Sequence, residues 1–186
     1  MLTIITPCCR PENLSQLFDS LDFDKLDRWL IVHDSDEPRK LFTHEKIVEI
    51  HHRSPPDGRA GHSQRNAGLE CVKDGLIYFL DDDTVIHPDF WKISPIFDDQ
   101  HFYTFDQQRW DEFVPNPGDT FRGNEPKLMK MDSAQYVVPR HMCGKFIEND
   151  YRADGFFIEE VGIRNPLSHV YIPIVACYYN YLRRAI

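Results

Sequence analysis

The sequence predicts an α/β fold in which residues 1–186 form a single domain around a mainly parallel central sheet. Short apolar runs alternate with helical patterns through the first half of the chain, as expected for parallel strands covered by helices. The 24 aromatic residues (13 Phe, 8 Tyr and 3 Trp) can fill one hydrophobic core but hardly two. No internal repeat, low-complexity tract or linker interrupts the 186 residues, so no domain boundary is expected.

Apolar periodicity defines the elements of the first half. Strands are predicted at residues 2–5, 29–33, 47–50 and 76–80. A helix should begin at Pro11, because leucine and phenylalanine side chains then recur at the spacing of one buried helix face. A second helix should run from about Ser63, a residue type that commonly caps helices, to Val72.

The alternation weakens beyond residue 83. Strands are predicted at 102–105, 128–131, 135–138 and 170–179, and a helix start at 155–161. Residues 106–127 contain several Pro and Gly and are predicted to form a long loop, a type of segment that is often functional.

Composition excludes several classes of protein. Lys and Arg number 21 against 30 Asp and Glu, and a net charge of −9 argues against a nucleic-acid-binding surface. Five cysteines without a C-x-x-C spacing suggest neither a disulfide framework nor a zinc knuckle. The N-terminus lacks the apolar core of a signal peptide, and no apolar stretch approaches the ~20 residues that span a bilayer. We therefore expect a cytoplasmic protein without a membrane span.

Three consecutive carboxylates, Asp81, Asp82 and Asp83, follow the apolar run at 76–80. Open α/β sheets bind ligands at the carboxyl ends of their strands, and alternation allows Asp81 and Asp83 to face the same side. Carboxylates packed this densely repel one another unless a hard divalent cation, Mn²⁺ or Mg²⁺, compensates their charge. The pattern predicts a metal site, although an acidic turn capped by Thr84 would produce the same residues.

Four segments resemble, in order, the motifs of GT-A-fold glycosyltransferases. They are Leu-Thr-Ile-Ile-Thr-Pro-Cys-Cys-Arg-Pro-Glu-Asn at 2–13, Ile-Val-His-Asp at 31–34, Gln-Arg-Asn-Ala-Gly at 64–68 and Ile-Tyr-Phe-Leu-Asp-Asp-Asp at 77–83. The last segment matches the strand and D-x-D motif of that fold. Inverting family-2 transferases share most of this set, and segments 64–66 and 78–83 are particularly similar to inverting β-1,3-glucuronyltransferases.

The resemblance implies a Rossmann-like nucleotide-diphospho-sugar transferase fold and a metal-dependent transfer of a sugar to the hydroxyl of a glycan or other acceptor. UDP-sugar is the favoured donor. Residues 1–90 would bind the nucleotide sugar and residues 91–186 the acceptor. The residues implied in nucleotide-sugar binding are Thr6, Pro7, Arg10, Asp34, Arg65, Asp81 and Asp82. Mn²⁺ or Mg²⁺, held by Asp83, Asp81 and a late histidine, His169, would stabilise the charge of the leaving diphosphate.

An inverting transfer also needs a general base that takes the proton of the acceptor hydroxyl. In the GT-A fold this carboxylate lies at the start of a late helix, and Asp154 occupies the matching place. Glu159 and Asp150 are alternatives, and a helix N-cap without chemistry would also account for Asp154. Asp132 is expected to help shape the acceptor site.

Two other functions stay open. Residues 81–85, Asp-Asp-Asp-Thr-Val, resemble the D-x-D-x-T motif of haloacid-dehalogenase phosphatases, although the threonine stands at 84 rather than 85. A non-catalytic module that only binds a sugar nucleotide would retain the same donor-binding motifs.

Overall fold

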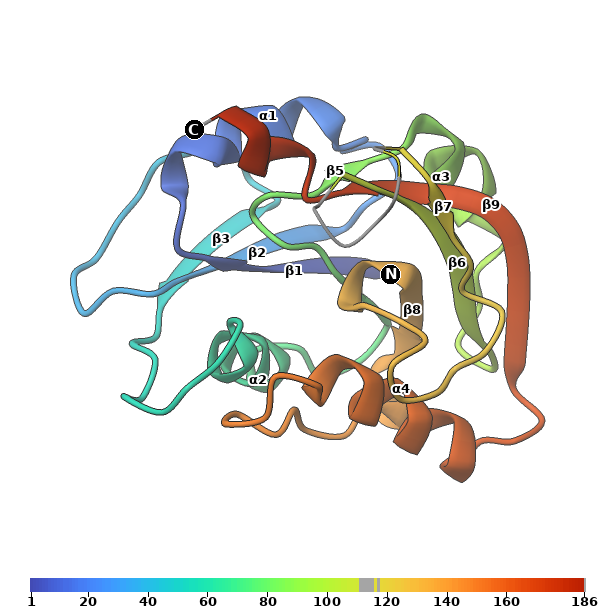
Figure 1. Ribbon diagram of the computed structural model, residues 1–186. Coiled ribbons are helices and arrows are strands. Elements are labelled where there is room, and N and C mark those ends of the chain that lie inside the picture. The colour runs from blue at the N-terminus through green and yellow to red at the C-terminus, as the bar shows by residue number, and fades with distance from the viewer. Residues whose placement is uncertain (111–115, 117, 186) are drawn as a thin grey trace.

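The computed structural model describes residues 1–110, 116 and 118–185. The described residues contain one nine-stranded sheet that lies between two layers of helices (Figure 1). Eight strands follow one another in the order β3 (Ile47–His51), β2 (Arg28–His33), β1 (Leu2–Cys8), β4 (Leu76–Phe79), β8 (Tyr136–Pro139), β6 (Phe102–Arg109), β9 (His169–Tyr179) and β5 (Val85–Ile86). The short strand β7 (Thr120–Phe121) pairs with β6 outside this path.

The sheet is mixed, which corrects the prediction of a mainly parallel sheet. Strands β3, β2, β1 and β4 are parallel to one another, as predicted for the first half of the chain. Beyond β4 the sheet continues with antiparallel β8, and β6 is antiparallel to β8. Strand β9 is parallel to β6, whereas β5 is antiparallel to β9. Strands β4, β6 and β9 therefore run in the same direction and end at the same edge of the sheet.

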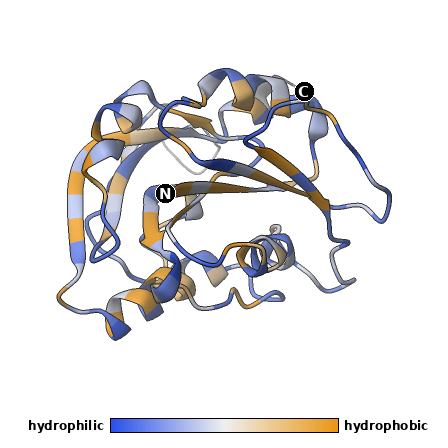
Figure 2. Cartoon of the chain, turned by 180° about the vertical axis from the view of Figure 1, so that it is seen from behind, coloured by the Kyte–Doolittle hydropathy of each residue, from blue (hydrophilic) through white to orange (hydrophobic). Residues whose placement is uncertain are grey.

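The helices cover both faces of the sheet (Figure 1). Helices α1 (Leu14–Ser20) and α3 (Pro88–Ile93) pack on one face, and α2 (His62–Glu70) and α4 (Ala153–Arg164) on the other. Short 3-10 turns occupy Pro11–Asn13, Ser94–Ile96, Ser133–Gln135, Arg140–Met142 and Tyr181–Ala185. Because strand side chains alternate, Ile4 faces the α1 and α3 side and Ile5 the α2 and α4 side. Hydrophobic residues accordingly gather along the strands between the layers (Figure 2).

Two sequence predictions of local structure differ from the structure, at residues 128–131 and at the start of α2. Residues 128–131 contain a turn rather than a strand, and Met129 has a left-handed φ of 63°. Helix α2 begins one residue before Ser63, with Gly61 as its N-cap in a left-handed conformation. A side chain there would meet Pro7, because a Cβ on Gly61 would lie 2.7 Å from the Pro7 Cβ.

The predicted loop at 106–127 begins as strand, since β6 continues to Arg109 and pairs with β7. Residues 111–115 and 117 of that segment lie outside the described residues. Pro173 lies in β9 at the point where the register of β9 against β6 shifts. Such an irregularity tolerates a residue without a backbone N–H. Among the helices of the described residues, none combines the length and hydrophobicity needed to cross a bilayer.

Candidate active site

A cavity of about 340 Å³ opens at the carboxyl ends of β1, β2 and β4. We call it the donor cavity. It is lined by six of the seven residues that the family resemblance implicated in nucleotide-sugar binding: Pro7, Arg10, Asp34, Arg65, Asp81 and Asp82. Asp83 and Asp154 also line it. Parallel strands bring these segments together because the loops that follow them meet at one edge of the sheet.

Thr6 is the exception among the predicted donor-binding residues. Its side chain is completely buried, and Thr6 Oγ1 accepts a hydrogen bond of 2.9 Å from Trp29 Nε1. The side chain therefore belongs to the core beneath the cavity. The following residues of this strand, Pro7 and Cys8, line the cavity.

Asp82 fixes the loop that follows β1. Its Oδ2 accepts hydrogen bonds of 2.7 Å from the backbone N–H groups of Cys9 and Arg10, and its Oδ1 contacts the Arg10 guanidinium. The side chain is 3% exposed. Both carboxylate oxygens are thus engaged, so Asp82 is suited to shape the cavity and less suited to take a further ligand.

Asp83 lies between two arginines. Its Oδ2 is 2.6 Å from Arg183 Nε and 3.0 Å from Arg10 Nη1. Burial and the neighbouring Asp81 raise the pKa of Asp83, while Arg10 and Arg183 oppose this shift. The second oxygen, Oδ1, has a hydroxyl contact of 3.4 Å with Thr84.

Arg65 joins the two halves of the chain at the cavity floor. Its guanidinium contacts Asp81 and lies 3.8 Å from Asp154 Oδ1. It also donates hydrogen bonds of 3.1 Å to Ser133 Oγ and of 2.6 Å to the Ala60 carbonyl oxygen. The residue is only 1% exposed. Burial opposes its charge, but Asp81 and Asp154 raise the pKa of Arg65 overall, so the buried guanidinium stays protonated.

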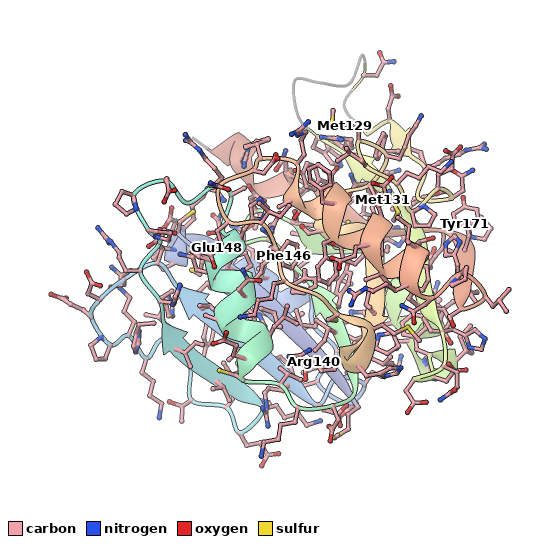
Figure 3. All side chains as sticks on the ribbon, turned by 90° about the horizontal axis from the view of Figure 1, so that it is seen from below. Met129, Met131, Arg140, Phe146, Glu148 and Tyr171 are labelled. Carbon is pink, nitrogen blue, oxygen red and sulfur yellow. The ribbon has the colours of Figure 1, made fainter. Side chains whose placement is uncertain are left out.

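The next residue in the sequence motif, Asn66, anchors the segment that precedes α4. Its side-chain oxygen accepts 2.8 Å from the Phe146 N–H, and its Nδ2 donates 3.0 Å to the Phe146 carbonyl oxygen and to Glu148 Oε1. The Phe146 ring stacks 4.4 Å from Phe157 of α4 and lies between α2 and α4 (Figure 3). These contacts hold α4 beside α2.

Asp154 projects from the first turn of α4 to the border of the donor cavity. A second cavity of about 330 Å³ adjoins the first, and Asp154 lines both. Asp154 Oδ1 is buried and has no hydrogen-bond partner among the described residues. Burial raises the pKa of Asp154 to about 7, with Arg65 opposing and Asp81 adding to the shift. A carboxylate that titrates near neutral pH can accept a proton from a hydroxyl.

The alternatives to Asp154 lie elsewhere. Glu159, further along α4, has a 3.5 Å contact with the Leu128 N–H and lines neither cavity. Asp150 pairs with the Arg152 side chain at 2.9 Å and is likewise absent from both linings. The structure therefore brings only one of the three predicted base candidates to the cavity.

His169 does not reach the strand-end aspartates. It begins β9, with Nε2 2.8 Å from Thr104 Oγ1 and its ring stacked 4.9 Å from Phe102. Strand β9 runs parallel to β6 and ends at the edge of the sheet where the cavity opens. His169 begins the strand and therefore lies at the opposite edge of the sheet, about 30 Å from the end of β9. The structure thus does not assemble the predicted ligand set of Asp83, Asp81 and His169.

Among the described residues, no three His, Cys, Asp or Glu side chains are grouped as a metal site. Mg²⁺, however, is usually bound by one or two carboxylates together with substrate phosphates and water. Asp83 Oδ1 and Asp81 Oδ2 suit this role, because each has only a 3.4 Å hydroxyl contact among the described interactions. The oxygen-only donor set at a ligand-sized cavity fits Mn²⁺ or Mg²⁺ held jointly with a substrate.

Sequence reasoning missed several residues that line the cavities. Arg183 contacts Asp83, and Arg183, Tyr151 and Tyr179 line both cavities. Asp132, which was expected to shape the acceptor site, also lines both cavities, and it accepts a hydrogen bond of 2.7 Å from Gln107 Nε2. A signal existed only for Tyr179, which ends a predicted strand, whereas Arg183 lies in a segment without a predicted element.

Comparison with known proteins supplies structural neighbours. No family model and no curated protein matches the sequence. The structure is similar to that of S. aureus TarS 1–349, with a TM-score of 0.71 and 16% identity, covering 96% of this chain and 60% of that chain. This likeness shows the fold.

Two further structures of the same TarS fragment contain ligands. The complex with UDP-GlcNAc has a TM-score of 0.64 at 15% identity, and the complex with UDP a TM-score of 0.66 at 14% identity. Each covers 95% of this chain, and 57% and 59% of the TarS chain, respectively. The present chain thus spans less than two thirds of these neighbours.

Proposed function

We propose that this chain is a glycosyltransferase that transfers a sugar from a nucleotide-diphosphate donor to an acceptor hydroxyl, with inversion. A UDP-sugar is the favoured donor, since TarS neighbours of the same fold bind UDP and UDP-GlcNAc. The observation that carries the proposal is the position of Asp154. This carboxylate lies where the donor cavity, lined by the strand-end aspartates, meets a second cavity of similar size.

The nucleoside would occupy the part of the donor cavity near β1 and β2. Asp34 is fixed there, because its Oδ1 accepts 2.9 Å from the Ser54 N–H. Its carboxylate can accept a hydrogen bond from the uracil N–H, and Arg59 on the adjacent loop supplies positive charge to the same cavity. These groups would orient the nucleotide with its diphosphate toward Asp81 and Asp83.

Charge balance supports a divalent cation as the cofactor. The donor cavity is lined by six aspartates and four arginines, so it does not attract a diphosphate by itself. Asp83 and Asp81 would hold Mn²⁺ or Mg²⁺ together with the donor phosphates. The bound ion supplies Lewis-acid stabilisation of the negative charge that develops on the leaving diphosphate.

Asp154 would act as the general base. In the proposed reaction the acceptor hydroxyl, entering from the second cavity, forms a bond to the anomeric carbon while the bond to the diphosphate breaks. The hydroxyl proton passes to Asp154, whose raised pKa suits it to this transfer. Arg65, 3.8 Å from Asp154, stays protonated throughout and orients the carboxylate.

The two alternatives differ in what they require. A phosphatase of the haloacid-dehalogenase type would use Asp81 as nucleophile, but the Asp81 carboxylate contacts the buried Arg65 and Ser133 and has no contact that favours this chemistry over donor binding. A binding module would need no base, whereas Asp154 stands at the cavity border with a pKa near neutrality. Neither alternative is favoured by a specific observation.

The proposal is tested by calorimetry with UDP and with UDP-GlcNAc, each with and without Mn²⁺, followed by an assay of a panel of UDP-sugars for released UDP. We expect binding that requires the metal and turnover with at least one donor. Asp83→Ala should abolish the metal-dependent part of the affinity, and Asp36→Ala, in an exposed turn outside the cavity, serves as the control. Unchanged affinity of Asp83→Ala would refute the ligand assignment, and binding without turnover would favour the binding module.

A further inference from the structure

The last helical turn, Tyr181–Ala185, brings an unpredicted arginine to the strand-end aspartates. The Leu182 N–H donates 3.0 Å to the Asp83 carbonyl oxygen, and the Leu182 side chain is buried. Arg183 Nε donates 2.6 Å to Asp83 Oδ2. Main-chain and side-chain contacts therefore both fix this turn against Asp83.

Arg183 differs from the other arginines beside these aspartates. Arg65 is fully buried, and Arg10 divides its guanidinium between Asp82 and Asp83. The side chain of Arg183 is 52% exposed and contacts a single carboxylate among the described hydrogen bonds and ion pairs. A guanidinium carries five N–H donors, so most of its donors remain available to a ligand.

The position of Arg183 matches the path of a nucleotide diphosphate. Asp34 marks the nucleoside end of the donor cavity, and Asp154 marks the border at which the sugar would be transferred. A diphosphate that connects nucleoside and sugar must lie between them. Arg183 lines the same border as Asp154, and its planar fork can bind two phosphate oxygens at once.

We propose that Arg183 positions the donor diphosphate and that it exchanges Asp83 for phosphate oxygens when the donor binds. This inference rests on the proposed function. Before the donor binds, Arg183 and Arg10 together neutralise Asp83, and Arg183 competes with any cation for that carboxylate. In the donor-bound site Asp83 is neutralised by the divalent cation instead, and the released guanidinium binds the diphosphate.

The exchange predicts that loss of Arg183 changes the affinities for Mn²⁺ and for UDP in opposite directions. A merely structural role of Arg183 would not produce this result. In calorimetry, Arg183→Ala should bind Mn²⁺ alone several-fold more tightly than the unmodified protein. The same variant should bind UDP in the presence of Mn²⁺ about tenfold more weakly, because a charge-assisted contact is lost. Its affinity for UMP should change less than about threefold, since UMP lacks the second phosphate. Arg164→Ala is the matched control, as Arg164 is similarly exposed at 46% and pairs with Glu160 outside both cavities.

The outcomes separate this inference from the proposed function. If the unmodified protein binds UDP with Mn²⁺ and Arg183→Ala binds it equally well, the inference fails and the proposed function stands. An equal loss of UDP and UMP affinity would also overturn it, because that result indicates a damaged cavity. Arg183→Lys keeps the charge without the fork and should recover only part of the UDP affinity. If the unmodified protein binds no uridine nucleotide under any condition, the proposed function itself fails.

Discussion

The two halves of the chain contribute carboxylates to one cavity, but they hold them in different ways. In the first half, Asp81, Asp82 and Asp83 each contact at least one arginine, and Asp82 also accepts two backbone hydrogen bonds. In the second half, Asp154 Oδ1 is buried without a hydrogen-bond partner among the described residues; His62 Nδ1 lies 3.7 Å and Arg65 Nη1 3.8 Å away.

This difference separates carboxylates held in place by arginines from a carboxylate of variable charge near neutral pH. Ion pairs and backbone hydrogen bonds fix the orientation of the first group, which suits these carboxylates to bind and orient a ligand. Asp154 has a side chain that is only 19% exposed and a pKa raised to about 7, so its charge changes near neutral pH, which suits it to move a proton. In the proposed function, the strand ends of the first half would therefore bind the donor, and the first turn of α4 would supply the base.

The largest effect should come from removing the variable charge. Asp154→Asn keeps the size of the side chain but cannot accept the hydroxyl proton, so kcat should fall by roughly 10³-fold. UDP affinity should stay within about threefold. Steady-state kinetics and calorimetry on the same preparation check both values, with Glu159→Gln as the control on the same helix. If Asp154→Asn retained turnover, another residue would be the general base, and the contrast between the two halves would be wrong.

Next in size is the loss of the link between the two halves. Arg65→Met leaves Asp81 without its buried partner, and breaking a buried pair from one side costs about 3–5 kcal/mol. The free energy of unfolding, measured by urea denaturation, should fall by about 3 kcal/mol or more. Arg164→Met, at an exposed pair, should change it by less than about 0.5 kcal/mol. A loss below about 1 kcal/mol in Arg65→Met would mean that strand pairing and apolar packing hold the halves together without a contribution from Arg65.

The first half was predictable because its information is local. Apolar runs define its strands, and parallel strands bring the residues after them to one edge, so Arg10, Asp34 and Asp81 were placed together from the sequence. The core position of Thr6 follows from the same alternation, since Thr6 faces the side of Ile4.

The second half depends on pairings between distant segments. The direction of β9 is set by its pairing with β6, and without that direction the sequence could not show that His169 and Arg183 lie at opposite ends of the strand. The same pairing carries Arg183 to a carboxylate 100 positions earlier in the chain. Periodicity also failed at 128–131, where an apolar run forms a turn.

A smaller effect should appear in the dependence of stability on pH. The pKa of Asp154 is raised from 3.8 to about 7 in the folded protein, mainly by burial, so the folded state binds more protons than the unfolded state between these values. Stability is therefore lost as pH rises through this window. The loss in the free energy of unfolding is at most about 4 kcal/mol, and Asp154→Asn removes it. We therefore expect this variant to be more stable than the unmodified protein by about 1–2 kcal/mol at pH 8 and by almost nothing at pH 4. Urea denaturation at both pH values checks this, and an equal change at both would place the effect in packing.

The smallest effect is expected at Asp34, the carboxylate that would accept from the nucleobase in the proposed function. Asp34→Asn retains an oxygen that can accept from the Ser54 N–H but exchanges the other acceptor for a donor. The uracil N–H then loses its partner, so the ratio of UDP to CDP affinity should fall by about three- to tenfold, in line with one hydrogen bond. Asp36→Asn, two residues further in an exposed turn, is the matched control and should leave the ratio unchanged. Competition calorimetry with the two nucleotides measures the ratio, and an unaltered ratio in Asp34→Asn would show that the base is read by other groups of the cavity.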